Sequence, residues 1–259
     1  MANHDVRPTI SSETINLLNN RRSIRKFSEK RVSCSHLDAL LSAALRAPTS
    51  SNIQAYSVIV VRNRDILSEI YPIVGKQEHV LNAPVFLCFC ADLTRMEAAI
   101  SARGGSMDNN PLEIGLVASI DASLVGMSAY LTAESLGMSG VMIGAVRNDP
   151  NKIAQILKLP DKVYAVFGMA LGWPDEAPKQ KPRMDKGTTI HFDHYGTQKD
   201  HRSLVTKLKD YDTALSEHYS SVGKPTTPDS WTADISKKFT DPSRKNLRAQ
   251  LQLRGFDWL

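Results

Sequence analysis

A long apolar segment over residues 112–136 constrains the fold of this 259-residue chain more than any other feature. Drawn as a helix, it is apolar over most of its circumference, through Ile114, Val117, Ile120, Ala122, Leu124, Val125, Met127 and Leu131. A helix that is apolar on all sides is buried. The segment is therefore either the central helix of the core or half of an interface between subunits, and its residues alone leave both readings open.

Shorter patterns on both sides of this segment predict an α+β core. Helical spacing and capping residues predict helices over residues 11–19, 35–46, 64–71, 94–103 and 150–157. Apolar runs predict strands over residues 56–61, 85–90, 140–144 and 164–173, and a loop follows Gly104 up to Pro111. These alternations favour a mixed α+β architecture over a purely helical or purely β fold.

The pattern changes after about residue 184, where strand signals end. Helices are predicted over residues 203–220, 231–239 and 243–253, joined by polar loops that contain proline. We therefore expect a core over residues 1–184 and a helical part over residues 185–259. The predicted helix at 203–220 carries an apolar stripe that requires a partner surface, either within its own domain or on another subunit.

Composition excludes several classes of protein. The net charge is +5, but the basic residues are scattered and form no long Lys/Arg run, so we expect no nucleic-acid partner. Residues 1–10 lack the apolar stretch of a signal peptide, and the longest uninterrupted apolar run, 83–91, is too short to cross a bilayer. Cys88 and Cys90 alternate on one face of a predicted strand and are expected to be core thiols. We expect a cytoplasmic protein without a membrane partner.

A basic segment at residues 21–27 is interrupted by two apolar side chains, Ile24 and Phe27. If both side chains anchor the segment to the core, some guanidinium groups point inward and require an anionic partner. The alternative is a basic helix end that is stabilised by the helix dipole. A second pair of cations, Lys181 and Arg183, flanks Pro182, which fixes the backbone between them.

Three further segments lie between these cations along the chain. Residues 47–54 are rich in hydroxyl and amide side chains, residues 75–80 precede a predicted strand, and residues 140–145 form a strand that ends in small residues. Cations, hydroxyls, amides and a small-residue strand end would together suit a phosphorylated, planar cofactor with polar edges. FMN is such a molecule.

Five motifs in this order and spacing resemble the FMN-dependent nitroreductase superfamily: R-S-I-R-x-F, A-P-T-S-S-N-x-Q, G-x-Q-x-H-V, G-x-x-I-G-x-x-R-N and L-G-W-P followed by K-P-R. The similarity runs from about residue 10 to the C-terminus and is closest to the branch of oxygen-insensitive NADPH nitroreductases and NADPH–flavin oxidoreductases. It implies an α+β fold with a mixed central sheet flanked by helices. It also implies a homodimer, in which residues 112–136 serve both as core helix and as interface and the helical C-terminal excursion embraces the partner subunit.

The resemblance assigns the cations to FMN. Arg22 and Ser23 match contacts to the ribityl phosphate, joined by Lys181 and Arg183 across the site, while Arg21 occupies a position that is often His in this branch. Arg25 matches the cation beside flavin N1 and the O2 carbonyl, where two-electron reduction places negative charge. For each of these cations the alternative is a surface or structural ion pair.

The polar segments receive matching roles. The hydroxyls of residues 49–51 can donate to phosphate or to the isoalloxazine edge, or they can act as turn formers; these residues are Thr49, Ser50 and Ser51. Gln77 matches the residue at the pyrimidine edge, whereas Gln54 could equally brace the start of a strand. Backbone N–H groups near flavin N5 are expected at the strand end, at Ile143, Gly144 and Ala145, although small residues at a packed strand end explain the same pattern.

No protein group is expected to act as nucleophile or general base, because hydride transfer from a nicotinamide to a flavin requires neither. His191 and His194 are three residues apart, but no third ligand with supporting spacing lies nearby, so we expect no metal. NADPH-preferring members of the branch carry arginines in the loop that follows residue 219. Here only Lys224 remains to meet the 2′-phosphate of NADPH, so NADH is an alternative co-substrate.

The resemblance implies an FMN-dependent oxidoreductase that transfers hydride from NADPH, or NADH, to bound FMN. Two electrons then pass to nitroaromatics, quinones or similar small-molecule acceptors by a ping-pong mechanism. One alternative is a flavin reductase that supplies reduced FMN to a partner protein. A non-enzymatic flavin-binding protein is the third reading.

Overall fold

The structure is a computed structural model that describes residues 10–107, 111–197, 200–241 and 243–257. Its contacts divide the chain into two compact units. The core unit comprises residues 1–177 together with 246–259, and the helical unit comprises residues 178–245. We expected the boundary at residue 184 and the C-terminal residues in the helical part, whereas the contacts group residues 246–259 with the core.

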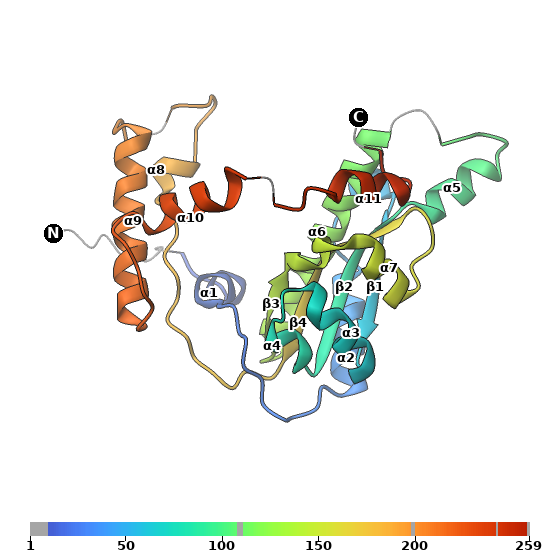
Figure 1. Cartoon of the computed structure of the whole chain (residues 1–259), viewed down its shortest axis with the longest axis horizontal. Helices are drawn as coiled ribbons and strands as arrows, with labels where there is room; N and C mark the ends of the chain where they lie inside the picture. The colour runs from blue at the N-terminus through green and yellow to red at the C-terminus, as the bar shows by residue number, and fades with distance from the viewer. Residues whose placement is uncertain (1–9, 108–110, 198–199, 242, 258–259) are drawn as a thin grey trace. The chain divides into compact units, whose positions relative to one another are not determined.

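Among the described residues, four strands of the core unit form one sheet in the order β1-β2-β4-β3 (Figure 1). The strands are β1 (Tyr56–Val61), β2 (Val85–Asp92), β3 (Ser139–Ile143) and β4 (Val163–Gly172). Each observed pairing is antiparallel, so the described residues contain no parallel pair of the kind that the expected mixed sheet would include. The predicted strands agree with the observed ones to within about two residues, and the α+β class is confirmed.

Strand β2 lies at the centre of three layers. Every one of its residues is buried, because successive side chains point to opposite faces and both faces are covered. Phe86, Cys88 and Cys90 pack toward α3 (Arg64–Ile73) and α7 (Pro150–Leu157) (Figure 1). Val85, Leu87 and Phe89 pack on the opposite face toward α2 (Cys34–Ala44) and α6 (Pro111–Ser135). Both cysteines are free, fully buried thiols, as predicted.

Helix α6 is the long apolar segment, and it uses two faces differently. Ala122, Val125 and Ala129 are fully buried against the sheet. A Cβ at Gly126 would lie 2.4 Å from the Phe167 ring, so glycine allows this close approach. The other face exposes a stripe of large apolar side chains at spacings of three and four residues: Leu112, Leu116, Ile120, Leu124 and Met127. We call these five residues the α6 stripe.

By length and apolar composition alone, α6 could cross a membrane, and 44% of its most apolar stretch is buried inside the molecule. A core helix has the same properties, and α6 packs on the sheet as one. The prediction that a helix apolar on all sides is buried therefore holds for one face of α6 only.

Shorter elements complete the core unit. These are α1 (Glu13–Asn20), α4 (Glu78–Leu81), α5 (Thr94–Ser101), α11 (Leu247–Leu253) and the 3₁₀ turns η1 (Ser50–Asn52) and η2 (Gly144–Asn148). The predicted helix over 243–253 begins only at 247, and Leu251 and Phe256 then pack against Tyr164. The predicted loop before α6 is seen at residues 104–107. Residues 108–110 of that loop and residues 1–9 at the N-terminus lie outside the described residues.

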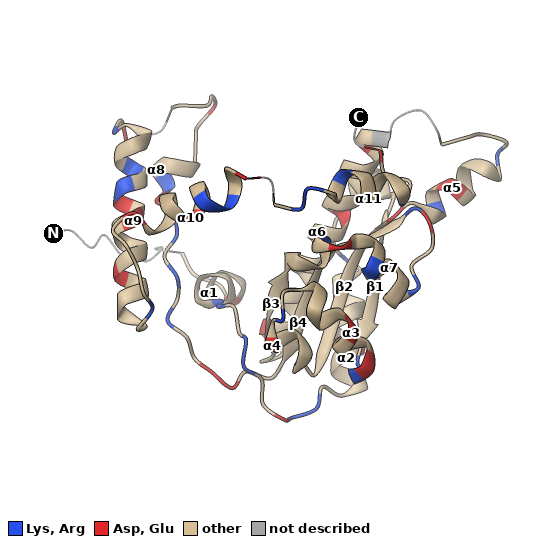
Figure 2. Cartoon of the chain, viewed as in Figure 1, with Lys and Arg blue, Asp and Glu red and all other residues tan. Residues whose placement is uncertain are grey.

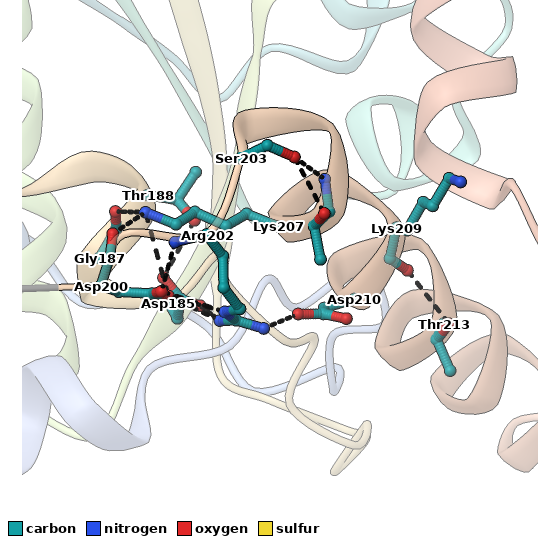
Figure 3. Close-up of polar contacts among 11 residues, drawn as sticks. Asp185, Gly187, Thr188, Asp200, Arg202, Ser203, Lys207, Lys209, Asp210 and Thr213 are labelled. Carbon is teal, nitrogen blue, oxygen red and sulfur yellow. Dashed lines mark hydrogen bonds and ion pairs between the residues drawn. The ribbon is translucent and has the colours of Figure 1, made fainter. Parts of the chain in front are cut away.

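The helical unit contains α8 (Lys186–Thr189), α9 (Leu204–Ser221) and α10 (Ser230–Phe239), and its described residues form no strand, as predicted. Buried polar side chains hold it together. Asp212 on α9 accepts hydrogen bonds from the Trp231 and Thr232 N–H groups at the start of α10, at 2.7 and 2.9 Å. A second polar cluster fixes the segment between α8 and α9 (Figure 3): buried Lys207 donates to the carbonyls of Gly187 and Asp200, at 2.6 and 2.8 Å.

Candidate functional site

The basic segment runs along the edge of the sheet beside β3. The Ile24 N–H donates to the Gly140 carbonyl at 3.0 Å, and the Tyr130 hydroxyl donates to the Arg22 carbonyl at 2.7 Å. Ile24 is buried, and Phe27 packs against the core and bridges to Pro174. The two predicted anchors are therefore in place, and they hold this segment, whose cations are blue after α1 in Figure 2, beside the start of β3.

The guanidinium groups of Arg22 and Arg25 have no carboxylate within ion-pair distance among the described residues. Glu176 approaches this segment, but its carboxylate accepts the backbone N–H groups of Arg25 and Lys26, at 2.5 and 3.1 Å. The Arg21 guanidinium lies 5.4 Å from the centre of the Tyr130 ring. Arg21, Arg22 and Arg25 thus lie on one anchored segment, and among the described residues Arg22 and Arg25 form no ion pair.

His79, on the short helix α4, faces the same segment. Its Nε2 atom is buried and has no hydrogen-bond partner among the described residues. Burial lowers the pKa of His79, the positive charge of Arg25 lowers it further, and the negative charge of Glu176 opposes both. His79 is the histidine of the G-x-Q-x-H-V motif, and nothing in that motif indicates an unsatisfied atom. Gln77, which is predicted to lie at the pyrimidine edge of the flavin, donates a hydrogen bond to the Val74 carbonyl at 2.7 Å.

The small-residue strand end lies where β3 passes into η2. Ile143 is buried, and Gly144 begins the turn. A Cβ at Gly144 would lie 3.4 Å from the Arg147 guanidinium, so a larger residue would be tightly accommodated there. Ala145 follows within the turn and packs partly against the core. These three residues adjoin β3, whose Gly140 binds the basic segment.

The hydroxyl-rich loop, residues 49–55, lies in a different part of the core unit from the basic segment. Thr49 is extended, and Ser51, Asn52 and Gln54 all have positive φ values, of 46°, 56° and 54°. The Gln54 side chain donates to Asn52, at 3.2 Å to its carbonyl oxygen. Asp121 of α6 binds this loop, and the sequence offers only one signal of that role, a lone carboxylate in the middle of an apolar segment.

In the helical unit, Lys181 and Lys224 converge on one aromatic ring. Lys181 Nζ lies 2.9 Å from the Tyr219 hydroxyl oxygen, and Lys224 Nζ lies 5.8 Å from the centre of the same ring. Arg183 donates to the Lys181 and Pro182 carbonyls, at 3.2 and 3.1 Å. Burial and then the charges of Lys181, Lys179 and Lys224 lower the pKa of His218. The structure therefore groups a residue assigned to FMN with the one assigned to NADPH.

Within the described part of the chain, no three His, Cys, Asp or Glu side chains are grouped so that they could hold a metal ion. His191 stacks on Tyr195, with 4.3 Å between ring centres, and its Nδ1 accepts the Gly196 N–H at 3.1 Å. His191 therefore has a structural role in its loop.

Comparison with known proteins places this geometry in a family. The family model described as "Nitroreductase family" matches residues 18–173, and that described as "Nitroreductase family, C-terminal domain" matches residues 181–258. The chain belongs to the nitroreductase family. The two matched regions together contain the basic segment, the hydroxyl-rich loop, the end of β3 and the lysines around Tyr219.

Curated relatives extend over nearly the whole chain. "Oxygen-insensitive NADPH nitroreductase" of Salmonella typhimurium is 34% identical over 247 residues, which is 95% of this chain and 98% of that protein. The Bacillus subtilis protein named FMN reductase, with NAD(P)H in its name, is 32% identical over 247 residues, which is again 95% of this chain and 98% of that protein. The predicted family and its NADPH branch are confirmed.

The solved structure of B. megaterium NfrA2 has a TM-score of 0.90 with this chain at 29% identity, covering 96% of this chain and 100% of that one. The likeness includes the helical region, since nearly all of both chains is covered. The predicted nitroreductase-like fold is therefore confirmed.

Proposed function

We propose that this protein is an FMN-dependent oxidoreductase that takes hydride from NADPH or NADH and passes two electrons to nitroaromatics, quinones or similar acceptors. The observation that carries the proposal is the pair of guanidinium groups, Arg22 and Arg25, held beside β3 without carboxylate partners among the described residues. Cations fixed in this way favour an anionic ligand. Membership of the family, and relatives named NADPH nitroreductase and FMN reductase, support the same chemistry.

The residues present fit FMN. Arg22 and Ser23 would hold the phosphate, with Arg21 beside them. For Lys181 and Arg183 of the helical unit, a phosphate contact stays a prediction from the resemblance. Arg25 would lie at the pyrimidine edge, and the buried, unpartnered Nε2 of His79 faces the same segment and can bond a polar ring edge. The end of β3 and the hydroxyls of residues 49–51 supply donors of the kind that the ring edges accept.

When bound, FMN supplies the two-electron redox chemistry, and the protein's own groups bind it, orient it and tune its potential. This division explains why no protein nucleophile, base or metal is assigned. Because nicotinamide and acceptor would use the same exposed ring face in turn, ping-pong kinetics follow.

Lys224 is the candidate to bind the 2′-phosphate of NADPH. Its ammonium lies near Tyr219 together with that of Lys181, and neither has a carboxylate within ion-pair distance among the described residues. One flexible ammonium gives a weaker and less directional contact than an arginine fork. A modest preference for NADPH over NADH follows from this replacement of arginines by Lys224.

The protein is also proposed to be a cytoplasmic homodimer with one FMN per subunit. The α6 stripe supports this proposal, because five large apolar side chains in one row on a single helix are more than an isolated chain usually exposes. The basic segment and the hydroxyl-rich loop contact α6 at Tyr130 and Asp121, about 14 Å apart along its axis. An FMN site formed between two copies of this chain would use both the basic segment and the hydroxyl-rich loop.

The first test is the identity of the cofactor. Purified protein is heat-denatured, and the released flavin is chromatographed against FMN and FAD standards. FMN at one per subunit is expected, and FAD, or no flavin after reconstitution, contradicts the proposal. Anaerobic reduction by NADPH and by NADH, followed by a panel of acceptors, then tests the chemistry.

The second candidate function is a flavin reductase that supplies reduced FMN to a partner. The relative named FMN reductase favours it specifically. In the acceptor panel, free FMN would then be reduced far more efficiently than nitroaromatics or quinones. A yellow protein that NADPH and NADH both fail to bleach would instead favour a non-enzymatic flavin-binding protein.

A further inference from the structure

We infer that Asp121 and Arg95 are positioning residues that together hold the hydroxyl-rich loop, residues 49–55, in the one backbone conformation that presents its hydroxyls to the cofactor. The inference rests on the proposed function, because it concerns how the proposed FMN site is built. It assigns roles to two side chains that come from different helices, α6 and α5.

The loop adopts a backbone conformation that its residues do not favour by themselves. Ser51, Asn52 and Gln54 all lie in the left-handed region, and none of them is glycine. Non-glycine residues in this region are strained and persist where surrounding contacts over-determine them. The loop must therefore be held from outside.

Asp121 binds the loop at both ends through its carboxylate. Its Oδ1 accepts the Ser50 N–H and its Oδ2 accepts the Ala55 N–H, each at 3.0 Å. The side chain is fully buried on an otherwise apolar part of α6. A buried carboxylate is costly unless hydrogen bonds satisfy it, so these two N–H groups and the carboxylate depend on each other.

Arg95 binds the end of the same loop through carbonyl groups, whereas Asp121 binds N–H groups. Its Nη2 donates to the Gln54 carbonyl at 3.0 Å and also to the Tyr56 carbonyl, while its Nη1 donates to the Ser57 hydroxyl at 3.2 Å. A carboxylate therefore takes the loop's N–H groups, and a guanidinium takes the carbonyls at its end. The peptide group between Gln54 and Ala55 is therefore bound at its carbonyl by Arg95 and at its N–H by Asp121.

Arg95 is itself anchored by Asp92, at 3.1 Å. Burial would raise the pKa of Asp92, but hydrogen bonds from Ser57 and Thr94 and the charge of Arg95 outweigh it and hold that pKa below its usual value. Asp92 thus remains ionised and keeps the guanidinium in place. The whole arrangement links α6, the loop, β1, the end of β2 and α5.

Two variants test the inference. Asp121→Asn keeps the size of the side chain but turns an N–H donor toward one of the two loop N–H groups. Arg95→Met keeps the apolar stem and removes both carbonyl contacts; its side chain is 54% exposed, so the variant is expected to fold. Asp149→Asn is the matched control, because Asp149 caps α7 through the Lys152 N–H at 3.1 Å in the same unit without touching the loop.

The measurements are the Kd of FMN for the apoprotein by fluorescence quenching, the visible circular dichroism of the bound flavin, and the melting temperature of the apoprotein. Asp121→Asn should raise the Kd about tenfold or more, the equivalent of one lost buried hydrogen bond. Arg95→Met should raise the Kd about threefold. Both variants should change the visible circular dichroism of the bound flavin, and in the same direction. Because asparagine caps a helix as well as aspartate, the control should keep its melting temperature, its Kd within about twofold and its flavin dichroism.

A double variant tests whether the two residues act on one loop. Since each holds the same segment, the combined effect on Kd should be smaller than the product of the single effects. If Asp121→Asn fails to fold, Arg95→Met decides alone. If the wild-type protein and both variants bind FMN equally well, this inference is wrong and the proposed function is unaffected. If the wild-type protein binds no FMN, the proposed function is wrong.

Discussion

Arg25 is the residue with the clearest expected effect on the flavin. A cation beside the edge that gains negative charge makes reduction easier, so Arg25→Ala should lower the two-electron midpoint potential by about 30 mV or more, where 30 mV corresponds to about 1.4 kcal/mol. The potential is measured by anaerobic titration against a reference dye. Lys26→Ala removes a neighbouring cation whose backbone binds the same Glu176 carboxylate, and it should leave the potential unchanged. Equal potentials for wild type and Arg25→Ala would remove Arg25 from this role.

His79 should make the stability of the apoprotein depend on pH. Burial, then the charge of Arg25, lower its folded pKa below 6.5, against the opposing charge of Glu176. The unfolded chain therefore binds more protons as the pH falls through 6.5, and the folded state loses stability. His79→Gln should lose less stability than wild type between about pH 7.5 and pH 5.5.

The experiment is urea unfolding of the apoprotein at several pH values. His218 also has a lowered pKa and contributes to the same pH dependence, so His218→Gln serves as the comparison at a half-buried site of the helical unit. Identical pH profiles for wild type and His79→Gln would show that His79 is not held neutral in the folded protein.

At the scale of elements, α6 is both a core helix and the proposed interface. Because the α6 stripe is exposed in the single chain, a charge placed there should leave the fold intact and weaken association. Ile120→Glu, at a side chain 54% exposed, should shift the protein toward a species of 28.6 kDa in light scattering. Ser68→Glu adds a charge at an exposed position of α3, on the opposite face of the sheet from α6, and as the off-stripe control it should remain dimeric. A wild-type monomer that retains FMN would contradict the dimer altogether.

The agreement between predicted and observed elements has local causes. Strand β2 is continuous in apolar residues, and helices α2, α3, α7 and α9 begin at capping residues, Ser33, Asn63, Asp149 and Ser203, whose side chains accept a backbone N–H. The four-residue helices α4 and α8 were not predicted, because one turn is too short to show a helical period. The exposure of only one face of α6 could not be predicted either, because it depends on where the sheet lies.

At the scale of the whole molecule, NADPH recognition should depend on Lys224. Exposed charge pairs contribute about 0.2–1 kcal/mol, so Lys224→Ala should raise the KM for NADPH by up to about fivefold and leave that for NADH nearly unchanged. The effect should diminish with salt. Lys209→Ala removes another lysine, on α9, and is the control. Parallel double-reciprocal lines are expected for every variant, since the two substrates use one pocket in turn.

A strong preference for NADPH that survives Lys224→Ala would point to another cation. Lys207 is not a candidate, because it is buried and donates to two carbonyls. Lys181 shares Tyr219 with Lys224 and is the next residue to replace.

The sequence by itself determined the longer helices, the strands, the anchors Ile24 and Phe27 and the family, since each depends on residue types at short or fixed spacings. Only the tertiary structure decided the conformation of the hydroxyl-rich loop, the unpartnered nitrogen of His79 and the convergence of two lysines on Tyr219. The physical reason is distance along the chain. Asp121 and Ser50 are 71 residues apart, yet they meet in one hydrogen bond, and the left-handed backbone beside it persists through such contacts rather than through any preference of its own residues.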